Sequence, residues 1–342
     1  MKIFYAVQAT GNGHISRAMT LLPYLQQYGT VDIFLSGDNS NLQLDAPIKY
    51  RSKGISLYYN CKGGLDYWQM IKKIQPWRVK QEIRDLPVEK YDLVLNDFDY
   101  ITSAACVKKE IPSIHFGHQA SFKSVRTPRP GKKSIAGEYL LKHYIKATHY
   151  TGLHFEQYDD FIFGPVIKNE ILKAEPSAGD HITVYLPSYC EPQLRQLFQA
   201  FPDFRFEIFS KETRSIRQEK NISFIPVNKE LFNKSLLSCT GIICGAGFET
   251  PAEALQLGKK ILAIPIAGQY EQECNAAALE QVGVLCLPAI DKNFATHFTR
   301  WIETPSSIQK DYSNSIAMSL EHIFSLQTIM QEHEDLLLEE TW

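Results

Sequence analysis

The side chains best suited to chemistry in the second half of the chain lie in residues 244–276. Gly245 and Gly247 follow an apolar segment and precede a helix expected at residues 250–257. Because glycine has no Cβ, the backbone can pass close to a ligand at these positions. The helix also directs its free N–H groups and its positive dipole end into the turn. A diphosphate is the ligand that this arrangement favours.

The residues around this turn define a set of candidate contacts. The expected diphosphate contacts are Gly13, Gly245, Ala246, Gly247, Phe248 and Thr250. Glu253 lies about one helical turn further along, where its carboxylate could accept hydrogen bonds from two ribose hydroxyls. Glu271 and Gln272 open the next helix and suit sugar hydroxyls. The alternative is an ordinary strand, turn and helix whose glycines serve packing and whose carboxylates face water.

A histidine and an aspartate in the N-terminal half could form a catalytic pair. His14 follows a glycine-rich loop, and Asp97 ends a strand expected at residues 91–96. In open α/β sheets, ligands bind beyond the carboxyl ends of strands, so both residues should border one crevice. Asp97 could bond one imidazole nitrogen, fix the tautomer and strengthen His14 as a general base. The alternative is a histidine that only forms structural hydrogen bonds.

Three further residues belong near the same crevice. His118 and Gln119 follow a strand expected at residues 113–116, on the side where an acceptor molecule would bind. Arg17 lies one turn after His14 and could reach a phosphate. A solvated helix residue is the interpretation that we favour for Arg17.

Composition restricts the class of protein. The chain has 342 residues, of which 44% are hydrophobic and 22% charged, and its formal net charge is −2. These values are typical of a globular protein with two domains and give no general attraction to nucleic acid. The cysteines form no C-x-x-C pair, which indicates reduced thiols and a cytoplasmic location. We expect no metal site, no cofactor, no signal peptide and no membrane span.

Alternating apolar strands and amphipathic helices predict an α/β fold with two Rossmann-like domains and mostly parallel sheets. The expected organisation is a first domain at residues 1–163, a linker at 164–180, a second domain at 181–305 and a helical tail at 306–342. The first glycine pair is followed by His-Ile-Ser without a third glycine. It therefore departs from the nicotinamide-dinucleotide fingerprint.

Hydrophobic spacing gives the expected elements. In the first domain they include helices at 15–28 and 65–85 and a strand at 55–59. In the second domain we expect strands at 182–186, 206–209, 223–225, 241–244, 261–264 and 284–286, and helices at 192–200, 229–238, 250–257 and 271–281.

Residues 121–150 carry a local excess of positive charge. Their basic side chains stand against a single acid, Glu138, and the second half of the segment has the spacing of an amphipathic helix. Such a segment can bind an anionic lipid surface. The alternative is a packed helix whose lysines face water.

The order of the motifs resembles a known enzyme family. G-x-G-F-x-T-x-x-E-A-L from residue 245, a buried strand, and E-Q-x-x-N-A from residue 271 are similar to the donor-binding half of GT-B glycosyltransferases. The branch is the one that contains the UDP-glycosyltransferases, the lipid II-forming N-acetylglucosaminyltransferase and the galactolipid synthases. The opening Q-x-T-G-N-G-H-x-x-R is similar to a group of uncharacterised bacterial and archaeal glycosyltransferases.

The resemblance implies a GT-B fold, in which two facing Rossmann-like domains border a cleft. The turn at Gly245 would hold the diphosphate and Glu253 the ribose, as the residues themselves suggest. Glu271 and Gln272 would bind the donor sugar. The loop at Val227 would hold the nucleobase through backbone groups, and the final helix would pack on the N-terminal domain.

The resemblance also implies a catalytic role for the N-terminal pair. His14 matches the family's catalytic histidine, and Asp97 with Phe98 matches the Asp-Phe that pairs with it. The donor turn departs from many plant members, which carry Asn where this chain has Glu249 and His where it has Gly245. Fewer side-chain donors therefore face the phosphates.

The expected function is transfer of a sugar from a nucleotide-diphospho-sugar, a UDP-sugar by resemblance, to an acceptor hydroxyl. The transfer would invert the anomeric centre and would not use a metal. Asp97 and Asp99 have the Asp-x-Asp spacing of a metal-binding pair, but they lie on the acceptor side, so we expect no metal there. A lipid-linked acceptor at the inner face of the membrane is one option. The alternatives are a nucleotide-sugar 2-epimerase or hydrolase, or a non-catalytic nucleotide-sugar-binding subunit.

Overall fold

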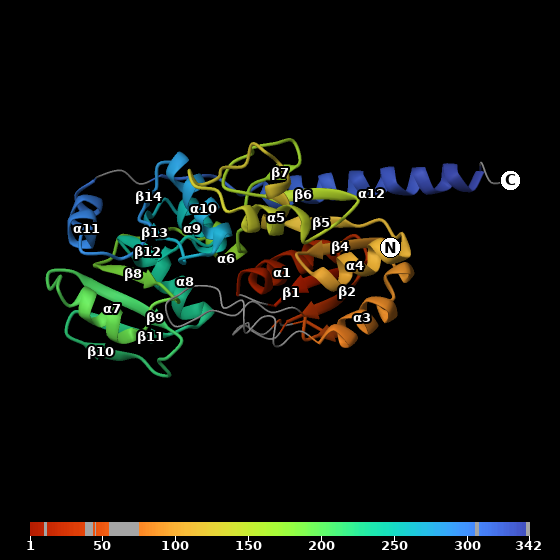
Figure 1. Cartoon of the computed structure of the whole chain (residues 1–342). Coiled ribbons are helices and arrows are strands. Elements are labelled where there is room, and N and C mark those ends of the chain that lie inside the picture. Colours follow the sequence, from red (N-terminus) through yellow and green to blue (C-terminus); the bar gives the residue numbers. More distant parts are fainter. Residues whose placement is uncertain (10–11, 38–43, 45, 55–74, 305–307, 340–342) are drawn as a thin grey trace.

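The computed structural model describes residues 1–9, 12–37, 44, 46–54, 75–304 and 308–339. Within them the chain forms two α/β domains that face each other (Figure 1). Each is built on a sheet of seven strands. The expected strand at residues 55–59, and the expected helix at 65–85 up to residue 74, lie outside the described residues.

The first sheet is parallel throughout, with the order β3-β2-β1-β4-β5-β6-β7. Strand β4 is buried along its whole length, as expected for a strand covered by helices on both faces. The strands are β1 (Lys2–Gln8), β2 (Thr30–Ser36), β3 (Ile48–Ser52), β4 (Leu93–Asp97), β5 (Ile114–Gly117), β6 (His149–Leu153) and β7 (Ile162–Phe163).

The second sheet has the order β10-β11-β9-β8-β12-β13-β14, and only its edge strand β10 is antiparallel to its neighbour. The strands are β8 (His181–Tyr185), β9 (Arg205–Ser210), β10 (Arg217–Glu219), β11 (Ile222–Pro226), β12 (Gly241–Gly245), β13 (Lys260–Ile264) and β14 (Leu285–Cys286). The sequence pattern indicated every strand of this sheet except β10.

Helices connect the strands of both sheets. They are α1 (Asn12–Leu25), α3 (Pro76–Asp85), α4 (Tyr100–Lys109), α5 (Ile135–His143), α6 (Asn169–Leu172), α7 (Glu191–Phe198), α8 (Lys229–Ser238), α9 (Glu249–Gln256), α10 (Tyr270–Gln281), α11 (Phe294–Glu303) and α12 (Ser315–Glu339), with the short 3-10 turns η1 (Val88–Lys90) and η2 (His118–Lys123). Helix α1 begins three residues earlier than the spacing predicted, so that His14 lies in its first turn.

The last helix returns to the first sheet. Helix α12 runs along β6 and β7 in Figure 1 and buries Ile316, Leu320 and Ile323. The ring of Phe324 stacks on Tyr28, with the ring centroids 3.7 Å apart.

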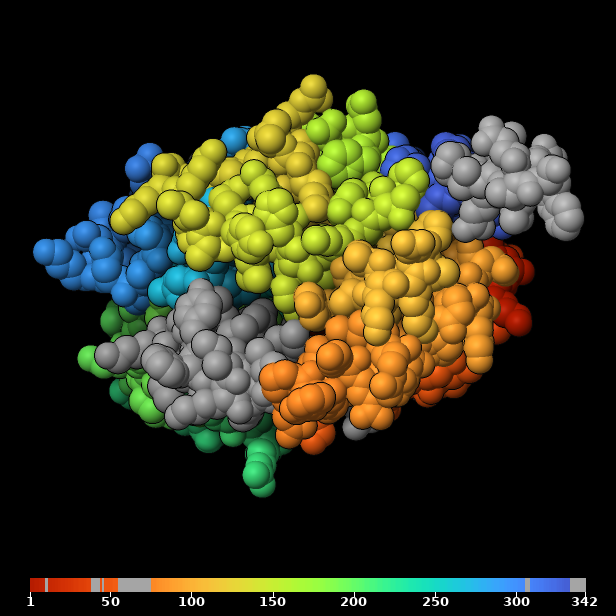
Figure 2. Space-filling view, turned by 45° about the vertical axis from the view of Figure 1, so that its right-hand side comes forward, coloured from red at the N-terminus to blue at the C-terminus, as the bar shows by residue number. Residues whose placement is uncertain are grey.

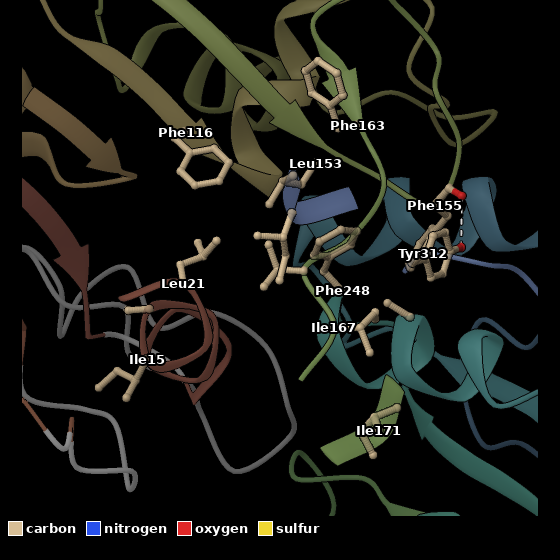
Figure 3. Close-up of a cluster of buried hydrophobic side chains, with 14 of the residues drawn as sticks. Ile15, Leu21, Phe116, Leu153, Phe155, Phe163, Ile167, Ile171, Phe248 and Tyr312 are labelled. Carbon is tan, nitrogen blue, oxygen red and sulfur yellow. Dashed lines mark hydrogen bonds between the residues drawn. The ribbon is translucent and has the colours of Figure 1, made fainter. Parts of the chain in front are cut away.

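A continuous apolar cluster joins the two halves of the molecule (Figure 3). Phe248, which precedes α9, packs against Phe155 with ring centroids 5.2 Å apart. Tyr312 from the segment before α12 donates a hydrogen bond to the Phe155 carbonyl at 3.0 Å. Contacts between the domains are therefore partly hydrophobic, and they fix how the strand ends of one sheet face those of the other.

Candidate active site

The carboxyl end of β4 and the first turn of α1 bring together the predicted catalytic pair. His14 Nδ1 lies 2.9 Å from Asp97 Oδ1. The side chain of His14 is 13% exposed, whereas that of Asp97 is fully buried. The histidine can therefore reach a ligand with one ring edge while the aspartate holds the other.

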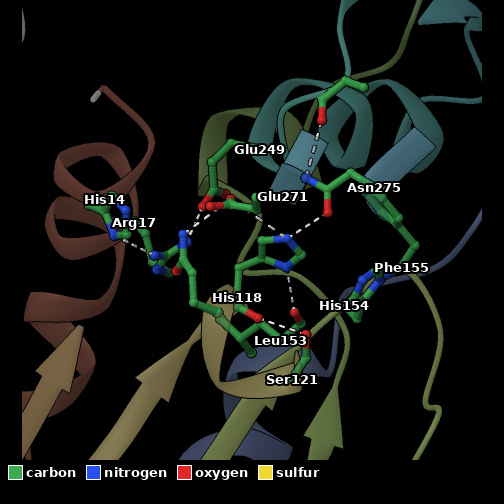
Figure 4. A network of polar contacts seen from close by, with 12 residues as sticks. His14, Arg17, His118, Ser121, Leu153, His154, Phe155, Glu249, Glu271 and Asn275 are labelled. Atoms are coloured by element: carbon green, nitrogen blue, oxygen red, sulfur yellow. Dashed lines mark hydrogen bonds and ion pairs between the residues drawn. The ribbon is translucent and has the colours of Figure 1, made fainter. Parts of the chain in front are cut away.

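Arg17 is part of the same cluster, and the preferred interpretation of a solvated residue is wrong. Its side chain is only 3% exposed. Its Nε donates to Asp97 Oδ2 at 3.1 Å, and its Nη2 donates to both carboxylate oxygens at 2.8 and 2.9 Å. Its Nη1 donates to Glu249 on α9 (Figure 4). Arg17 thus links the first domain to the second.

The charge state of Asp97 follows from these neighbours. Burial disfavours its ionised form, but Arg17 and His14 outweigh burial and hold the pKa of Asp97 well below its usual range. An ionised Asp97 accepts a hydrogen bond from Nδ1–H of His14, which leaves Nε2 as the basic nitrogen. Arg17 Nη2 also lies 2.9 Å from His14 Nδ1. Because arginine can only donate, this contact favours an unprotonated Nδ1, whereas the contact with Asp97 favours a protonated one. The basic Nε2 depends on the hydrogen bond to Asp97.

Gly117, at the end of β5, has no Cβ and so leaves room for the side chains of Asp97 and Arg17. A Cβ at Gly117 would lie 2.7 Å from Asp97 Oδ1 and 3.4 Å from Arg17 Nη2. Its φ of +146° also strains any other residue. The requirement for glycine here depends on a contact between neighbouring strands.

On the second domain, the glycine turn lies between β12 and α9. Neither Gly245 nor Gly247 has a positive φ, so the backbone conformation does not itself require glycine at these positions. A Cβ at Gly247 would meet no atom within 4 Å, and one at Gly245 would come no closer than 3.7 Å to Gln272 Oε1. Both positions thus leave room beside the backbone at the start of α9.

Two of the expected diphosphate contacts have other partners. Ala246 is fully buried, and its N–H donates to the Ile264 carbonyl at 3.3 Å. That N–H is not available to a phosphate. The ring of Phe248 stacks on His118 with a centroid distance of 4.0 Å. Thr250 lies half-buried in the first turn of α9.

The predicted ribose and sugar contacts are partly engaged within the protein. Glu253 is buried and forms an ion pair with Lys168 at 2.8 Å. Gln272 Oε1 accepts a hydrogen bond from the Ile266 N–H at 2.9 Å. Glu271 accepts a hydrogen bond from Gln119 Nε2 at 3.2 Å.

His118 and Gln119, for which an acceptor-side position is predicted, contact the second domain. Both are buried. His118 Nε2 lies 2.7 Å from Asn275 Oδ1, and its Nδ1 lies 2.9 Å from the Leu153 carbonyl (Figure 4). Burial lowers the pKa of His118 below its ordinary value. In this arrangement the ring serves the contact between the domains.

Val227 lies between β11 and the start of α8 and is half-buried. Strand β11 is separated from β12 by β9 and β8, all of them parallel. Three strand spacings correspond to about 14 Å.

The molecule has two facing domains with mostly parallel sheets, and polar strand ends lie at their shared boundary. This arrangement is that of the GT-B class of glycosyltransferase. The family model described as glycosyl transferase family 1 matches residues 1–302, and the chain belongs to this family. The protein is therefore a glycosyltransferase. No curated protein matches the sequence.

Solved structures show the same fold at low sequence identity. MurG of Acinetobacter baumannii is 16% identical with a TM-score of 0.56, and the match covers 95% of this chain and 99% of that one. UGT2 of Phytolacca americana, complexed with UDP-2-fluoro-glucose and pterostilbene, is 13% identical with a TM-score of 0.58, covering 96% and 93%. The glycosyltransferase VinC in complex with dTDP is 14% identical with a TM-score of 0.55, covering 96% and 100%.

No described helix is long and apolar enough to cross a bilayer. Among the same residues, no group of three or more His, Cys, Asp or Glu side chains has the spacing to hold a metal ion.

Proposed function

We propose that the protein transfers a sugar from a nucleotide-diphospho-sugar, most simply a UDP-sugar, to an acceptor hydroxyl with inversion and without a metal. One observation carries the proposal. The turn that holds His14 touches the start of α9, because a Cβ at Gly13 would lie 3.1 Å from Glu249 Cγ. The base of one domain thus adjoins the proposed diphosphate site of the other.

The proposed chemistry divides between the domains. Nε2 of His14 accepts the proton of the acceptor hydroxyl while its oxygen attacks the anomeric carbon, and the bond from that carbon to the diphosphate oxygen breaks. Attack from the face opposite the leaving group inverts the centre. The N-terminus of α9, with Gly247 and Thr250, stabilises the departing diphosphate.

The remaining donor contacts follow the strand ends of the second sheet. The backbone at Val227 binds the base, and Glu253 shares its carboxylate between Lys168 and the ribose hydroxyls. Glu271 and Gln272 contact the donor sugar from the start of α10. The UDP-2-fluoro-glucose in the UGT2 structure and the dTDP in the VinC structure support a nucleotide donor.

A thermal-shift screen of UDP-, TDP-, GDP- and ADP-sugars tests this donor class. A ligand at 100 times its dissociation constant should stabilise the protein by about 2.7 kcal/mol. Gly247→Val should remove the shift because it fills the space beside the turn. Gly131→Val is the matched control, since a Cβ at Gly131 also meets no atom within 4 Å but lies on an exposed loop. A screen without any stabilising nucleotide sugar would refute the proposal, and labelled products distinguish transfer from epimerisation or hydrolysis.

We also propose that residues 121–150 contact an anionic lipid surface. Helix α5 buries Leu141 against Phe122 and Tyr270, but its outer side presents Ile135 and Tyr139, which are 90% and 68% exposed. Lys132 and Lys133 lie beside them and are exposed. The segment forms part of the upper surface in Figure 2. An apolar outer side flanked by lysines is the pattern of a helix that lies in a membrane interface.

Vesicle flotation tests the lipid contact. The protein should float with vesicles that contain phosphatidylglycerol and stay behind with pure phosphatidylcholine, because charge attraction adds to apolar burial. Ile135→Asp should reduce flotation several-fold. Ile216→Asp is the control, since Ile216 is 61% exposed but lies in the second domain. Absence of flotation with either lipid would exclude the contact.

A further inference from the structure

The guanidinium of Arg17 forms hydrogen bonds with both domains. Its Nε and Nη2 edge is bonded to Asp97 on the first domain. Its Nη1 edge is directed at Glu249, the first residue of α9 on the second domain (Figure 4). The first edge fixes Arg17 in place, and the second presents a cationic donor to the start of α9.

Glu249 lies in an unfavourable place for a carboxylate. Three carboxylates, those of Asp97, Glu249 and Glu253, surround two cations, Arg17 and Lys168. Burial raises the pKa of Glu249 to about 7, Arg17 opposes this rise, and Glu253 and Asp97 add to it. A donor diphosphate at the start of α9 would bring further negative charge beside the same carboxylate.

We infer that Glu249 occupies the diphosphate's place on Arg17 in the unliganded protein, and that the donor displaces this carboxylate and makes it take up a proton. The inference rests on the proposed function, since it assumes a diphosphate donor. It assigns Arg17 as a donor-binding residue and Glu249 as its competitor. The protonated Glu249 then donates a hydrogen bond to a phosphate oxygen, whereas the ionised form repels it.

The exchange balances in charge and atoms. One ion pair, Arg17 with Glu249, is replaced by an ion pair of Arg17 with a phosphate oxygen. One proton passes from solvent to the Glu249 carboxylate for each donor bound. The groups that face Glu249 are His14 and Arg17 of α1, Tyr5 of β1, Asp97 at the end of β4 and Glu253 of α9. Glu271 of α10 belongs to the same polar network (Figure 4).

Linkage fixes the sign of the pH dependence. A bound diphosphate raises the proton affinity of Glu249, so donor binding is coupled to proton uptake above a pH of about 7 and not below it. At pH 8 the wild type should take up close to one proton per donor and bind about tenfold more weakly than at pH 6. UDP-glucose and TDP-glucose are suitable probes, because neither diphosphate diester gains or loses a proton in this range.

Isothermal calorimetry in buffers of different ionisation enthalpy measures both quantities. Glu249→Gln keeps the shape and a hydrogen-bond donor but cannot titrate. It should abolish proton uptake and bind about tenfold more tightly than wild type at pH 8, with equal affinity at pH 6. Uridine, which has no phosphate, should bind both proteins equally at both pH values. Glu230→Gln is the matched control, because Glu230 is an exposed first-turn glutamate of α8.

Arg17→Lys gives a second measurement that keeps a buried cation. Lysine cannot bond Asp97 and a phosphate together in the forked geometry of arginine, so donor affinity should fall about tenfold while uridine affinity is unchanged. Wild-type binding without proton uptake, or weaker donor binding by Glu249→Gln at pH 8, overturns the inference and leaves the proposed function standing. Failure of wild-type protein to bind any nucleotide sugar removes the proposed function and the inference with it.

Discussion

Replacement of His14 by alanine should lower the rate of sugar transfer by a factor of about 10² to 10⁴. The acceptor hydroxyl would then have no side chain to accept its proton as the new bond forms. Donor binding should be unchanged, because the proposed phosphate and ribose contacts belong to Arg17, to α9 and to the second sheet, and His14 is not among them. The expected loss is therefore in kcat, with the dissociation constant of the nucleotide sugar preserved.

Single-turnover transfer with a labelled donor measures the rate, and calorimetry measures the affinity. His297→Ala is a suitable control, since His297 lies on α11 at the far edge of the second domain (Figure 1). An unchanged transfer rate in His14→Ala would show that another group accepts the proton. Equal loss of binding and transfer would instead give His14 a role in holding the donor.

Much of the fold follows from local pattern. The apolar strands of the second sheet and the helices between them were predicted within a few residues, because burial on both faces produces continuous hydrophobic runs. Strand β10 has the sequence RQE and pairs at an exposed edge. It has no apolar run to reveal it. Helix α1 begins before the residue that the spacing predicts, because Asn12 and Gly13 are residue types typical of loops.

The polar cluster was only half predictable, for a different reason. His14 and Asp97 each follow a strand or a glycine pair, and these local signals mark a strand-end site. Arg17 has the spacing of a surface helix residue. Its burial is favourable because of two carboxylates far away in sequence, those of Asp97 and Glu249, which lie 80 and 232 positions further on. Gly117 and Lys168 likewise owe their roles to Asp97 and Glu253, with which they share no sequence motif. Long-range partners of this kind leave no periodicity.

Replacement of Asp97 by asparagine should destabilise the protein by about 3–5 kcal/mol, the usual cost of removing one partner of a buried ion pair. Arg17 would keep its charge at 3% exposure but would lose the carboxylate that three of its hydrogen bonds reach. Transfer should fall as well. An asparagine amide can present its NH₂ group to Nδ1 of His14 and so favour the tautomer in which Nε2 carries the proton.

Asp99→Asn is the matched control for this change. Asp99 is also buried and lies two residues further on, but it caps α4 by accepting a hydrogen bond from the Thr102 N–H at 2.6 Å. Asparagine caps a helix about as well as aspartate, so the free energy of unfolding should change by less than about 1 kcal/mol. Urea unfolding measures both variants, and equal effects at the two positions would contradict the special role of the Arg17 pair.

The ion pair of Asp97 and Arg17 also determines how the unfolding free energy of the wild type should depend on pH in acid. The folded-state pKa of Asp97 lies well below its usual range, so its contribution is complete above the unfolded-state pKa of about 3.9. The contribution is then lost as the pH falls from there toward the folded value. Asp97→Asn has no such group, so its unfolding free energy should fall less steeply than that of wild type below about pH 4. Parallel acid profiles for the two proteins would mean that Asp97 is not the ionised partner of Arg17, and the orientation of His14 would then need another cause.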